Sequence, residues 1–562
     1  MITLYRGLNR PDGTVIGDCP TTCQEYPVST PLAASSHAVS PSTRRRWLAL
    51  VALMLPVLLV SIDNTVLSFA VPALSRDLQP TATQLLWIVD IYPLVLAGLL
   101  VTMGTLGDRL GRRRLLLIGA TGFGVVSVWA AFSADASHLI AARAAMGVFG
   151  ATLMPATLAL LRNVFTDDGE RRFAIAVWAA GFSGGAALGP IVGGWLLEHF
   201  WWGSVFLLNV PVLVVFLIAA PFLVPESRGD RTGRFDVLSV TLSILATVPV
   251  VYGVKTFAHD GFVVGAVAPL LVAVIAGTWF VRRQLRRPEP LLDVRLFQRP
   301  VFAASVVANL VAALAIAGLL FLLAQYLQLV LGLSPMVAGL WLLPGLVATV
   351  TCGLIAAAVA ERAPLHVLVP LGIAVSGGGY LLGTTLTGDS GIGVLVAIFV
   401  LVGAGAGFTE TLTNDAILAA VPPARAGAAS SISETAYELG SAFGVAILGS
   451  LASATYRAQV EIPAVLPAAE RAAAGETLGG AVEVAAGAAD PAVGGALLES
   501  AKTAFAEGMA ATAVAGVVAM ALTAVGVGLA LRRADGDHGA GGPRSADAAG
   551  RQPEPSVPSR TH

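Results

Sequence analysis

Six carboxylates in this chain stand inside long apolar runs, where an acidic side chain is costly to place. They are Asp63, Asp90, Glu410, Asp415, Glu434 and Glu438. In the stretch SSISETAYELG, Glu434 and Glu438 are four residues apart and therefore share one face of a helix. A protonated carboxylate is cheap to bury, whereas a deprotonated one needs a cation beside it. One acidic site can therefore hold a proton and a cation in turn, and this exchange is the chemistry that these residues indicate.

A basic residue, Arg143, also stands in an apolar run, LIAARAAMGVFGA. A buried arginine usually pairs with an acid. The alternative is that its long side chain extends to a membrane interface. Asp90 and Asp415 lie near the ends of their runs, so either could instead be hydrated or cap a helix end.

Aromatic side chains in the same runs could offer ring faces to a cation. The candidates are Trp87, Tyr92, Trp178, Trp341 and Tyr437. Most aromatic residues in such helices serve packing or the membrane interface, so we expect only some of these candidates to line a cavity.

The apolar runs that carry these residues determine the class of protein. Hydrophobic residues make up 56% of the 562 residues and charged residues only 12%, about half of the roughly 25% that is typical of soluble proteins. A bilayer core needs about 20 apolar residues per helix. We therefore predict an all-α polytopic membrane protein with fourteen transmembrane helices, near residues 47–67, 85–106, 113–134, 138–161, 173–196, 203–223, 237–257, 262–281, 301–330, 335–360, 365–386, 391–420, 427–454 and 507–531.

The arginines predict the orientation of these helices, because excess positive charge marks cytoplasmic loops. Eighteen of them fall in alternate predicted loops, within 109–114, 162–172, 228–234 and 282–299 and at Arg362 and Arg425. The run Arg44, Arg45 and Arg46 before the first helix belongs to the same set. The other loops hold only five basic residues: Arg76, Lys255, Arg457, Arg471 and Lys502. We therefore expect both termini in the cytoplasm and a multi-pass protein of the plasma (inner) membrane.

Two similar glycine patterns indicate an internal repeat. GGAALGPIVGG at 184–194 and GSAFGVAILGS at 440–450 lie eight predicted helices apart. This offset fits two six-helix halves with two inserted helices between them, and repeated halves are a common plan of transporters.

The domain boundaries follow from this count. We expect an N-terminal half over 47–224, two inserted helices with their flanking loops over 225–299, and a C-terminal half over 300–531. Within the C-terminal half, residues 456–504 would form an extracellular loop with a short amphipathic helical hairpin. The polar segments 1–46 and 532–562 would be disordered cytoplasmic tails.

Two motifs in the N-terminal half are more specific than composition. The loop GTLGDRLGRRR could be an ordinary positively charged loop, but its spacing is distinctive: Gly104, Asp108, Arg109, Gly111 and Arg112. The fifth predicted helix carries Gly185, Gly189, Pro190, Gly193 and Gly194. Small residues let helices touch and a proline bends them, although generic helix packing uses the same residues.

These motifs resemble the signature loop and the antiporter helix of the major facilitator superfamily. Four further stretches are similar to its fourteen-helix drug:proton antiporters, and among these to the quaternary-ammonium (Qac-type) multidrug exporters of bacteria: LLVSIDNTVLSFAVPAL (58–74), WIVDIYPLVLAG (87–98), LLDVRLF (291–297) and SPMVAGLWLLP (334–344). The resemblance covers most of residues 45–531, and the Ala- and Arg-rich composition resembles an actinobacterial version.

The resemblance implies a role for each motif. The 104–114 loop would gate the cytoplasmic face, Asp63 would couple transport to protons, and Arg143 would work beside it. Glu434 and Glu438 match an acidic pair of these exporters. We expect Glu410, Asp415 and Asp90 to contribute to the same cation and proton site.

Three positions depart from the pattern of these exporters. Met146 replaces a usual glutamine, and Ser433 stands where the Qac-type exporters have a third acid. Thr349 stands where an exporter of divalent cations has an acid, which argues against dicationic substrates.

We therefore expect a proton-coupled exporter of hydrophobic cations, such as quaternary ammonium compounds and dyes, that works by alternating access as a monomer. A dedicated exporter of one antibiotic or natural product is the alternative. The Gly-Pro helix and the acids argue against a nutrient importer or a membrane sensor.

The partners would be small-molecule drugs, protons and the lipid bilayer, not nucleic acid. The sequence has no P-loop, zinc pattern or catalytic-triad spacing, so we expect no enzyme activity, metal, cofactor or use of ATP.

Overall fold

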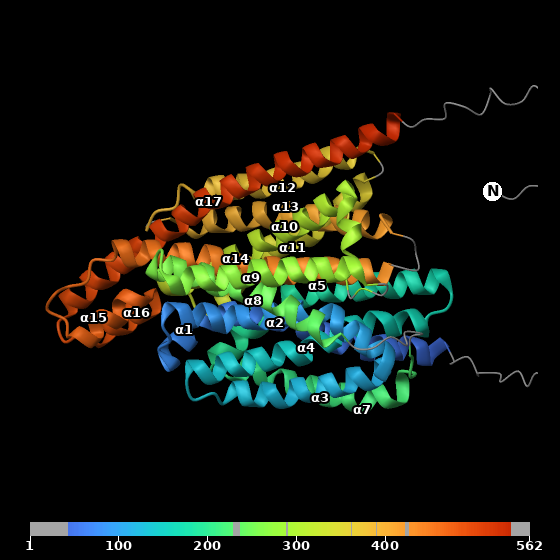
Figure 1. The fold of residues 1–562 in the computed structure, drawn as a ribbon. Helices are drawn as coiled ribbons and strands as arrows, with labels where there is room; N and C mark the ends of the chain where they lie inside the picture. The colour runs from blue at the N-terminus through green and yellow to red at the C-terminus, as the bar shows by residue number, and fades with distance from the viewer. Residues whose placement is uncertain are drawn as a thin grey trace, which may run out of the picture. The chain divides into compact units, whose positions relative to one another are not determined.

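The computed structural model describes residues 43–228, 236–287, 290, 292–360, 362–388, 390–421 and 426–540, and no strand occurs in these ranges. The α-helices, in chain order, are α1 Thr43–Leu78, α2 Ala82–Leu110, α3 Arg112–Ala131, α4 Ala136–Val164, α5 Asp168–His199, α6 Ser204–Leu207, α7 Asn209–Leu223, α8 Val237–Asp260, α9 Val264–Arg286, α10 Pro300–Gln325, α11 Pro335–Val359, α12 Leu365–Gly383, α13 Ile392–Ala419, α14 Ala426–Gln459, α15 Ala468–Glu476, α16 Leu478–Gly487 and α17 Pro491–Ala540 (Figure 1). A 3-10 helix, η1 Val294–Gln298, precedes α10, and a π-helix, η2 Tyr326–Val330, continues it.

The predicted all-α membrane fold is confirmed. Thirteen helical segments of the described residues are long and apolar enough to cross a membrane, and α5 occupies the remaining predicted position, 173–196. The sixth predicted helix is divided into α6 and α7. Residues 43–46 and 532–540, which we expected in the tails, are helical in α1 and α17, and the rest of both predicted tails lies outside the described residues.

The internal repeat is visible in the helix contacts. α5 packs on α1 as α14 packs on α10, and α4 packs on α2 and α3 as α13 packs on α11 and α12. Glycines allow the close pairs: a methyl group added at Gly185 would lie 2.8 Å from Cβ of Ser61, and one added at Gly440 would meet the carbonyl oxygen of Leu310. The two halves therefore use one packing plan.

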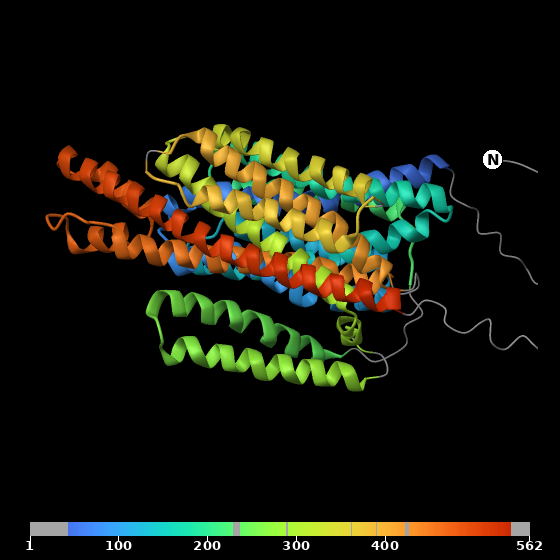
Figure 2. The same cartoon turned by 90° about the horizontal axis from the view of Figure 1, so that it is seen from above.

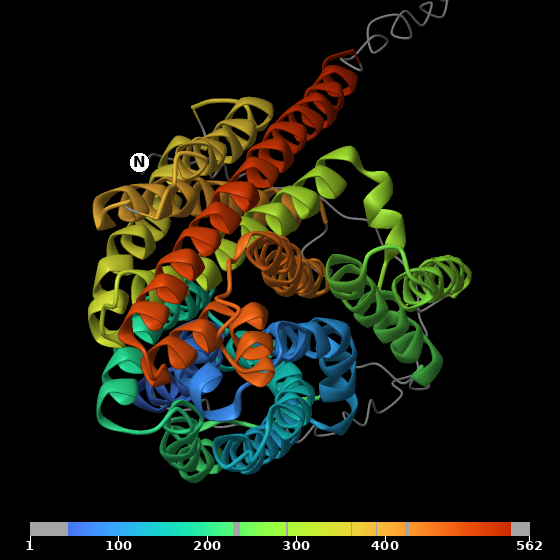
Figure 3. The ribbon, with the colours of Figure 1, turned by 90° about the vertical axis from the view of Figure 1, so that its left-hand side faces the viewer.

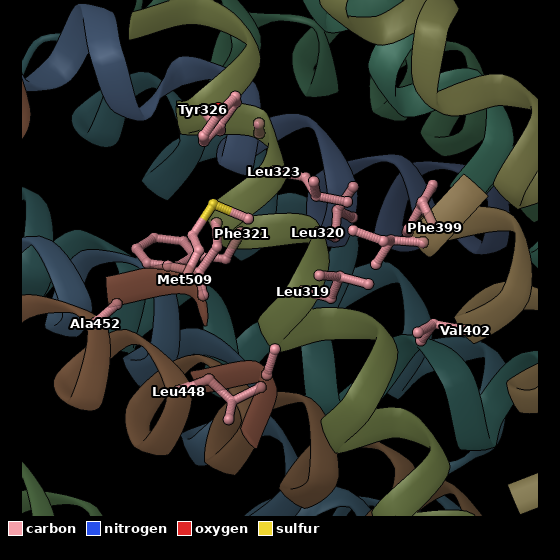
Figure 4. Close-up of a cluster of buried hydrophobic side chains, with 14 of the residues drawn as sticks. Leu319, Leu320, Phe321, Leu323, Tyr326, Phe399, Val402, Leu448, Ala452 and Met509 are labelled. Atoms are coloured by element: carbon pink, nitrogen blue, oxygen red, sulfur yellow. The ribbon is translucent and has the colours of Figure 1, made fainter. Parts of the chain in front are cut away.

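The C-terminal half packs around α10. Its buried side chains lie between those of α13, α14 and α17, and the cluster includes Leu319, Leu320, Phe321, Phe399, Val402, Leu448, Ala452 and Met509 (Figure 4). Phe69 of α1 and Leu86 of α2 join this cluster from the N-terminal half. The two halves therefore meet through apolar contacts at the end of the molecule where α1 ends and α2 begins.

The inserted helices α8 and α9 form a hairpin whose α8 contacts α2 and α14 (Figures 2 and 3). Asp236 closes the hairpin: it caps α8 and lies 2.9 Å from Nη2 of Arg283 and 3.1 Å from Nε of Arg287. Burial would raise the pKa of Asp236, but the hydrogen bonds from Arg283 and Ser239 outweigh it and lower the pKa to about 2. The carboxylate is therefore charged at neutral pH and holds the two helices together.

The segment between α14 and α17 contains the short helices α15 and α16 and lies against the turn between α1 and α2. Glu476 accepts a hydrogen bond from the backbone nitrogen of Ala82 (3.4 Å), and Gln79 donates one to Glu483 (3.2 Å). Tyr456 fixes the segment by donating to the carbonyl oxygen of Ala474 (2.8 Å). The segment is shorter than the predicted loop because α14 runs to Gln459 and α17 begins at Pro491.

Candidate functional site

Asp63 and Arg143 form a buried ion pair inside the N-terminal half. Oδ2 of Asp63 on α1 lies 2.6 Å from Nη1 of Arg143 on α4, and their side chains are 1% and 2% exposed. The arginine therefore does not extend to a membrane interface. Charges this deeply buried persist only when they are paired.

The guanidinium of Arg143 is held from two further directions. Its Nε donates to the carbonyl oxygen of Ile88 on α2 (3.3 Å), and its Cζ lies 4.4 Å from the ring centroid of Tyr92. Phe206 covers it from α6 at 5.8 Å. A carboxylate, a carbonyl and an aromatic face thus position one cation.

Two acids of the C-terminal half lie on α14. Glu438 is 1% exposed, and its Oε1 accepts a hydrogen bond from Nδ2 of Asn64 on α1 (3.3 Å). Neither Oε2 of Glu438 nor Oε1 of Glu434 has a hydrogen-bond partner among the described residues. These oxygens are therefore the acceptors that a proton or a ligand cation can occupy.

Asn64 connects the two halves of the site, because it follows Asp63 directly on α1. Aromatic rings close the same boundary: Tyr437 of α14 meets Phe182 of α5 edge to face, with centroids 6.0 Å apart. Glu410 on α13 is half-buried and interacts electrostatically with Glu434. Three carboxylates thus gather in the C-terminal half, opposite the neutralised pair of the N-terminal half.

The glycines of α5 determine where α1 lies. Gly185, Gly189 and Gly193 recur every four residues and face Ser61, Thr65 and Val66 of α1, on either side of Asp63. Ser61 and Thr65 donate to the α5 carbonyl oxygens of Phe182 and Ala186. On another face, Pro190 and Gly194 of α5 contact Gly339 and Met336 of α11. The Gly-Pro motif therefore packs α5 against both halves.

We expect Gly189→Ala to destabilise the protein by about 1–3 kcal/mol, because the added methyl group would collide with the Thr65 hydroxyl and with α1 beside Asp63. Thermal unfolding in detergent measures this loss as a lower melting temperature. Gly184→Ala on the same helix is the matched control, because an added methyl group there meets nothing within 4 Å. Equal melting temperatures for the two variants would contradict this account of the motif.

The predicted 104–114 loop is mostly helical. α2 continues to Leu110 and α3 begins at Arg112, so Gly111 alone connects them, with a φ of 104° that favours glycine. Glu226, after α7, occupies the space that a Gly111 side chain would need and accepts a hydrogen bond from the backbone nitrogen of Arg113 (3.1 Å). The backbone nitrogen of Arg112 donates to the carbonyl oxygen of Ser227 (2.8 Å). The side chain of Asp108 lies outside the described residues.

Several predicted site residues lie elsewhere. Asp90 is fully buried, but it pairs with Lys255 of α8 at 2.7 Å, and Trp87 lies beside this pair. Asp415 is exposed near the end of α13, and Trp341 is 43% exposed on α11. Trp178 donates from Nε1 to the Thr157 hydroxyl on α4 (3.3 Å). Of the five aromatic candidates, only Tyr92 and Tyr437 accompany the charges of the site.

Three residues of this arrangement were not predicted. Asn64 is a common polar residue within IDNTVL, and only the position of α14 shows its contact. Lys255 stands at the end of the predicted helix 237–257, where a lysine is expected to reach the loop, yet it is buried. Glu226 gave a usable signal, because an acid next to a proline and close to an arginine-rich segment suggests pairing. No group of three or more metal-ligating side chains occurs in the part of the chain that the structure describes.

Comparisons with known proteins identify the family and relatives of this chain. Residues 53–445 match the family profile of the Major Facilitator Superfamily. The chain is 49% identical over 498 residues to the multidrug efflux pump LfrA of Mycolicibacterium smegmatis, which covers 88% of this chain and 99% of that protein. It is 40% identical over 464 residues to the methyl viologen resistance protein SmvA of Salmonella typhimurium, and this match covers 82% of this chain and 93% of that protein.

A solved structure supports the fold. A bacterial homologue of the human lysosomal transporter Spinster, in an inward-facing and unoccupied conformation, matches with a TM-score of 0.60 at 18% identity. The match covers 88% of this chain and 99% of that one.

Proposed function

Because this chain belongs to the major facilitator superfamily and is a multi-pass membrane transporter, not an enzyme, we propose that it is a proton-coupled antiporter that exports hydrophobic cations. The observation that carries the proposal is the hydrogen bond from Asn64 to Glu438. It joins two sites of different character: a paired acid, Asp63, in one half, and acids with free oxygens in the other.

These two sites support an exchange of protons for cations. A cation entering from the cytoplasm would bind the deprotonated Glu434 and Glu438, beside the Tyr437 ring. Protons arriving from the outer side would neutralise these carboxylates and release the cation. Asp63, held by Arg143, would carry the proton that links this step to the movement of the halves. Since proton and cation compete for the same oxygens, the proton gradient drives export.

The substrate class follows from the acids and from the relatives. A multidrug efflux pump and a methyl viologen resistance protein are among the relatives, and methyl viologen carries two positive charges. We propose that this chain exports monovalent cations such as quaternary ammonium compounds and dyes. Thr349 argues against divalent cations, because an exporter of such cations has an acid at that position. Glu410, however, adds a third acid near Glu434, so a dication is the second substrate to test.

The remaining expectations belong to the same proposal. The protein works as a monomer in the plasma (inner) membrane, needs no ATP, metal or cofactor, and has both termini in the cytoplasm. The α15–α16 segment then lies outside, and Gly111 lies at the cytoplasmic face.

The proposal is tested in lipid vesicles that contain the purified full-length protein. Ethidium is expected to accumulate in vesicles with an acidic lumen and to leave when a protonophore collapses the pH gradient. ATP without a gradient should produce no accumulation. Methyl viologen is assayed in parallel to decide between monovalent and divalent preference. Failure of every cation tested to respond to the gradient would refute proton-coupled export.

A further inference from the structure

A second buried ion pair lies outside the proposed site. Nζ of Lys255 on α8 lies 2.7 Å from Oδ2 of Asp90 on α2, with the two side chains 1% and 0% exposed. The same ammonium lies 4.2 Å from the ring centroid of Trp87, whose ring is 6.3 Å from that of Tyr252 on α8. A carboxylate and an indole face therefore hold the lysine at the junction of α2 and α8.

The two faces of α2 have different partners. Trp87, Asp90 and Leu94 recur at the spacing of one helix face, and this face contacts α8. Ile88 and Tyr92 lie on another face and contact Arg143. Asp90 is therefore directed away from the ion pair of the proposed site and towards the inserted hairpin.

Helix α8 also covers the line of contact between the two halves. α2 and α14 pack on each other, and Val251 of α8 packs in one buried cluster with Leu94 of α2 and with Ala442 and Ala446 of α14. Val248 of α8 and Phe443 of α14 extend this cluster. The buried part of the α8–α14 contact is thus made by apolar and small side chains, and Lys255 also lines a small pocket with Ser450, Ser453 and Arg457 of α14. The contact of α8 with α2 is the one that includes a buried ion pair.

The contact of α8 with α14 and its contact with α2 differ in how easily they can be separated. Apolar surfaces can slide past each other, but separating a buried ion pair leaves two unpaired charges. The rest of the hairpin follows α8, because Asp236 pairs with Arg283 and Arg287.

We propose that the Asp90–Lys255 pair makes the α8–α9 hairpin part of the N-terminal moving body, so that α8 travels with α2 and parts from α14 in each transport cycle. This inference rests on the proposed function, because it assumes alternating access. Asp90 and Lys255 are then positioning residues and bind neither substrate nor transported protons. The four-carbon stem of Lys255 and the indole of Trp87 seal the pair from lipid.

Cysteine cross-linking tests the movement directly. Cys19, Cys23 and Cys352 are first replaced by serine, which leaves no native cysteine. Val251→Cys is then combined with Leu94→Cys, to join α8 to α2, or with Ala446→Cys, to join α8 to α14. Ethidium transport is measured before and after treatment with a flexible bifunctional thiosulfonate reagent, which joins the two cysteines through reducible disulfide bonds. We expect the α8–α2 cross-link to leave transport within about twofold of the uncross-linked sample, and the α8–α14 cross-link to stop it until the link is reduced.

The opposite pattern, or the same effect of both cross-links, would overturn the inference. Gel migration reports the cross-link itself, so its yield is known independently of transport.

A substitution cycle tests the charges. Asp90→Asn and Lys255→Met are each expected to lower transport at least about tenfold, because each leaves a buried charge unpaired. The double variant Asp90→Asn/Lys255→Met is expected to recover to within about threefold of wild type. Lys502→Met is the matched control, since Lys502 is the other lysine of the chain and lies in α17, with its side chain only partly buried.

A double variant that remains inactive while folded would mean that Asp90 itself handles protons or substrate, which overturns the positioning role. The melting temperatures of wild type, the two single variants and the double variant give a second measurement that does not depend on transport. If wild type moves no cation, the proposed function fails. Recovery of the melting temperature in the double variant would still show that the pair attaches α8 to α2.

Discussion

Replacing Asp63 with asparagine should abolish gradient-driven transport, with a loss of at least about 100-fold, since a positioned proton-transfer group is typically worth about 10²–10⁴-fold. The amide cannot bind and release a proton at neutral pH. It also leaves the Arg143 guanidinium, 2.6 Å away and 2% exposed, without its counter-charge. Vesicle assays with ethidium and an imposed pH gradient measure this loss.

Asp415→Asn is the control for this substitution, because it makes the same chemical change at an exposed position of α13 and should leave the rate within about twofold. Removing one partner of a buried pair also destabilises a protein by about 3–5 kcal/mol, so the amount of folded protein must be measured. Asp63→Glu keeps the charge and should retain part of the activity. Wild-type gradient-driven transport by folded Asp63→Asn would remove Asp63 from the coupling mechanism.

Replacing Glu438 with glutamine should weaken the export of cations about tenfold or more, and that of an uncharged drug much less. The glutamine carbonyl still accepts the hydrogen bond from Asn64, so the geometry is retained while the charge is lost. A tenfold loss corresponds to about 1.4 kcal/mol, well below the attraction of about 4 kcal/mol between two unit charges about 4 Å apart at an effective dielectric constant of about 20. Binding of ethidium and of an uncharged drug to the purified protein measures the difference.

Glu499→Gln, at an exposed position of α17, is the matched control and should bind both compounds as wild type does. Equal losses for the charged and the uncharged drug would mean that Glu438 serves protons or folding, not the recognition of cations.

The helices could be predicted because their signals are local, and an acid could be expected as the partner of Arg143, although the sequence did not identify Asp63 as that acid. Apolar runs of about 20 residues have few alternatives to a membrane helix. An arginine within such a run needs an acid, which limits its partners to a few residues. The repeated glycines indicated two matching halves because close helix contact requires small residues at a fixed spacing.

The direction in which a side chain points could not be predicted in this way. Asp90 and Glu438 are both acids in apolar runs, yet Asp90 faces α8 and Glu438 faces α1. The sequence of one helix does not show which of its faces contacts which neighbouring helix. The inserted hairpin gives α2 an additional neighbour, α8, and the apolar run of α2 carries no sign of it. Trp341 shows the same limit: it is exposed on α11, although its run is as apolar as that of Tyr92.

The single-residue connection at Gly111 has a mechanical consequence. Since α2 ends at Leu110 and α3 begins at Arg112, the chain has no spare length between them, and Glu226 and Ser227 fasten the start of α3 to the segment after α7. The ends of these helices cannot spread independently. The start of α3 must therefore follow any displacement of the end of α2, and the segment after α7 is carried along with both.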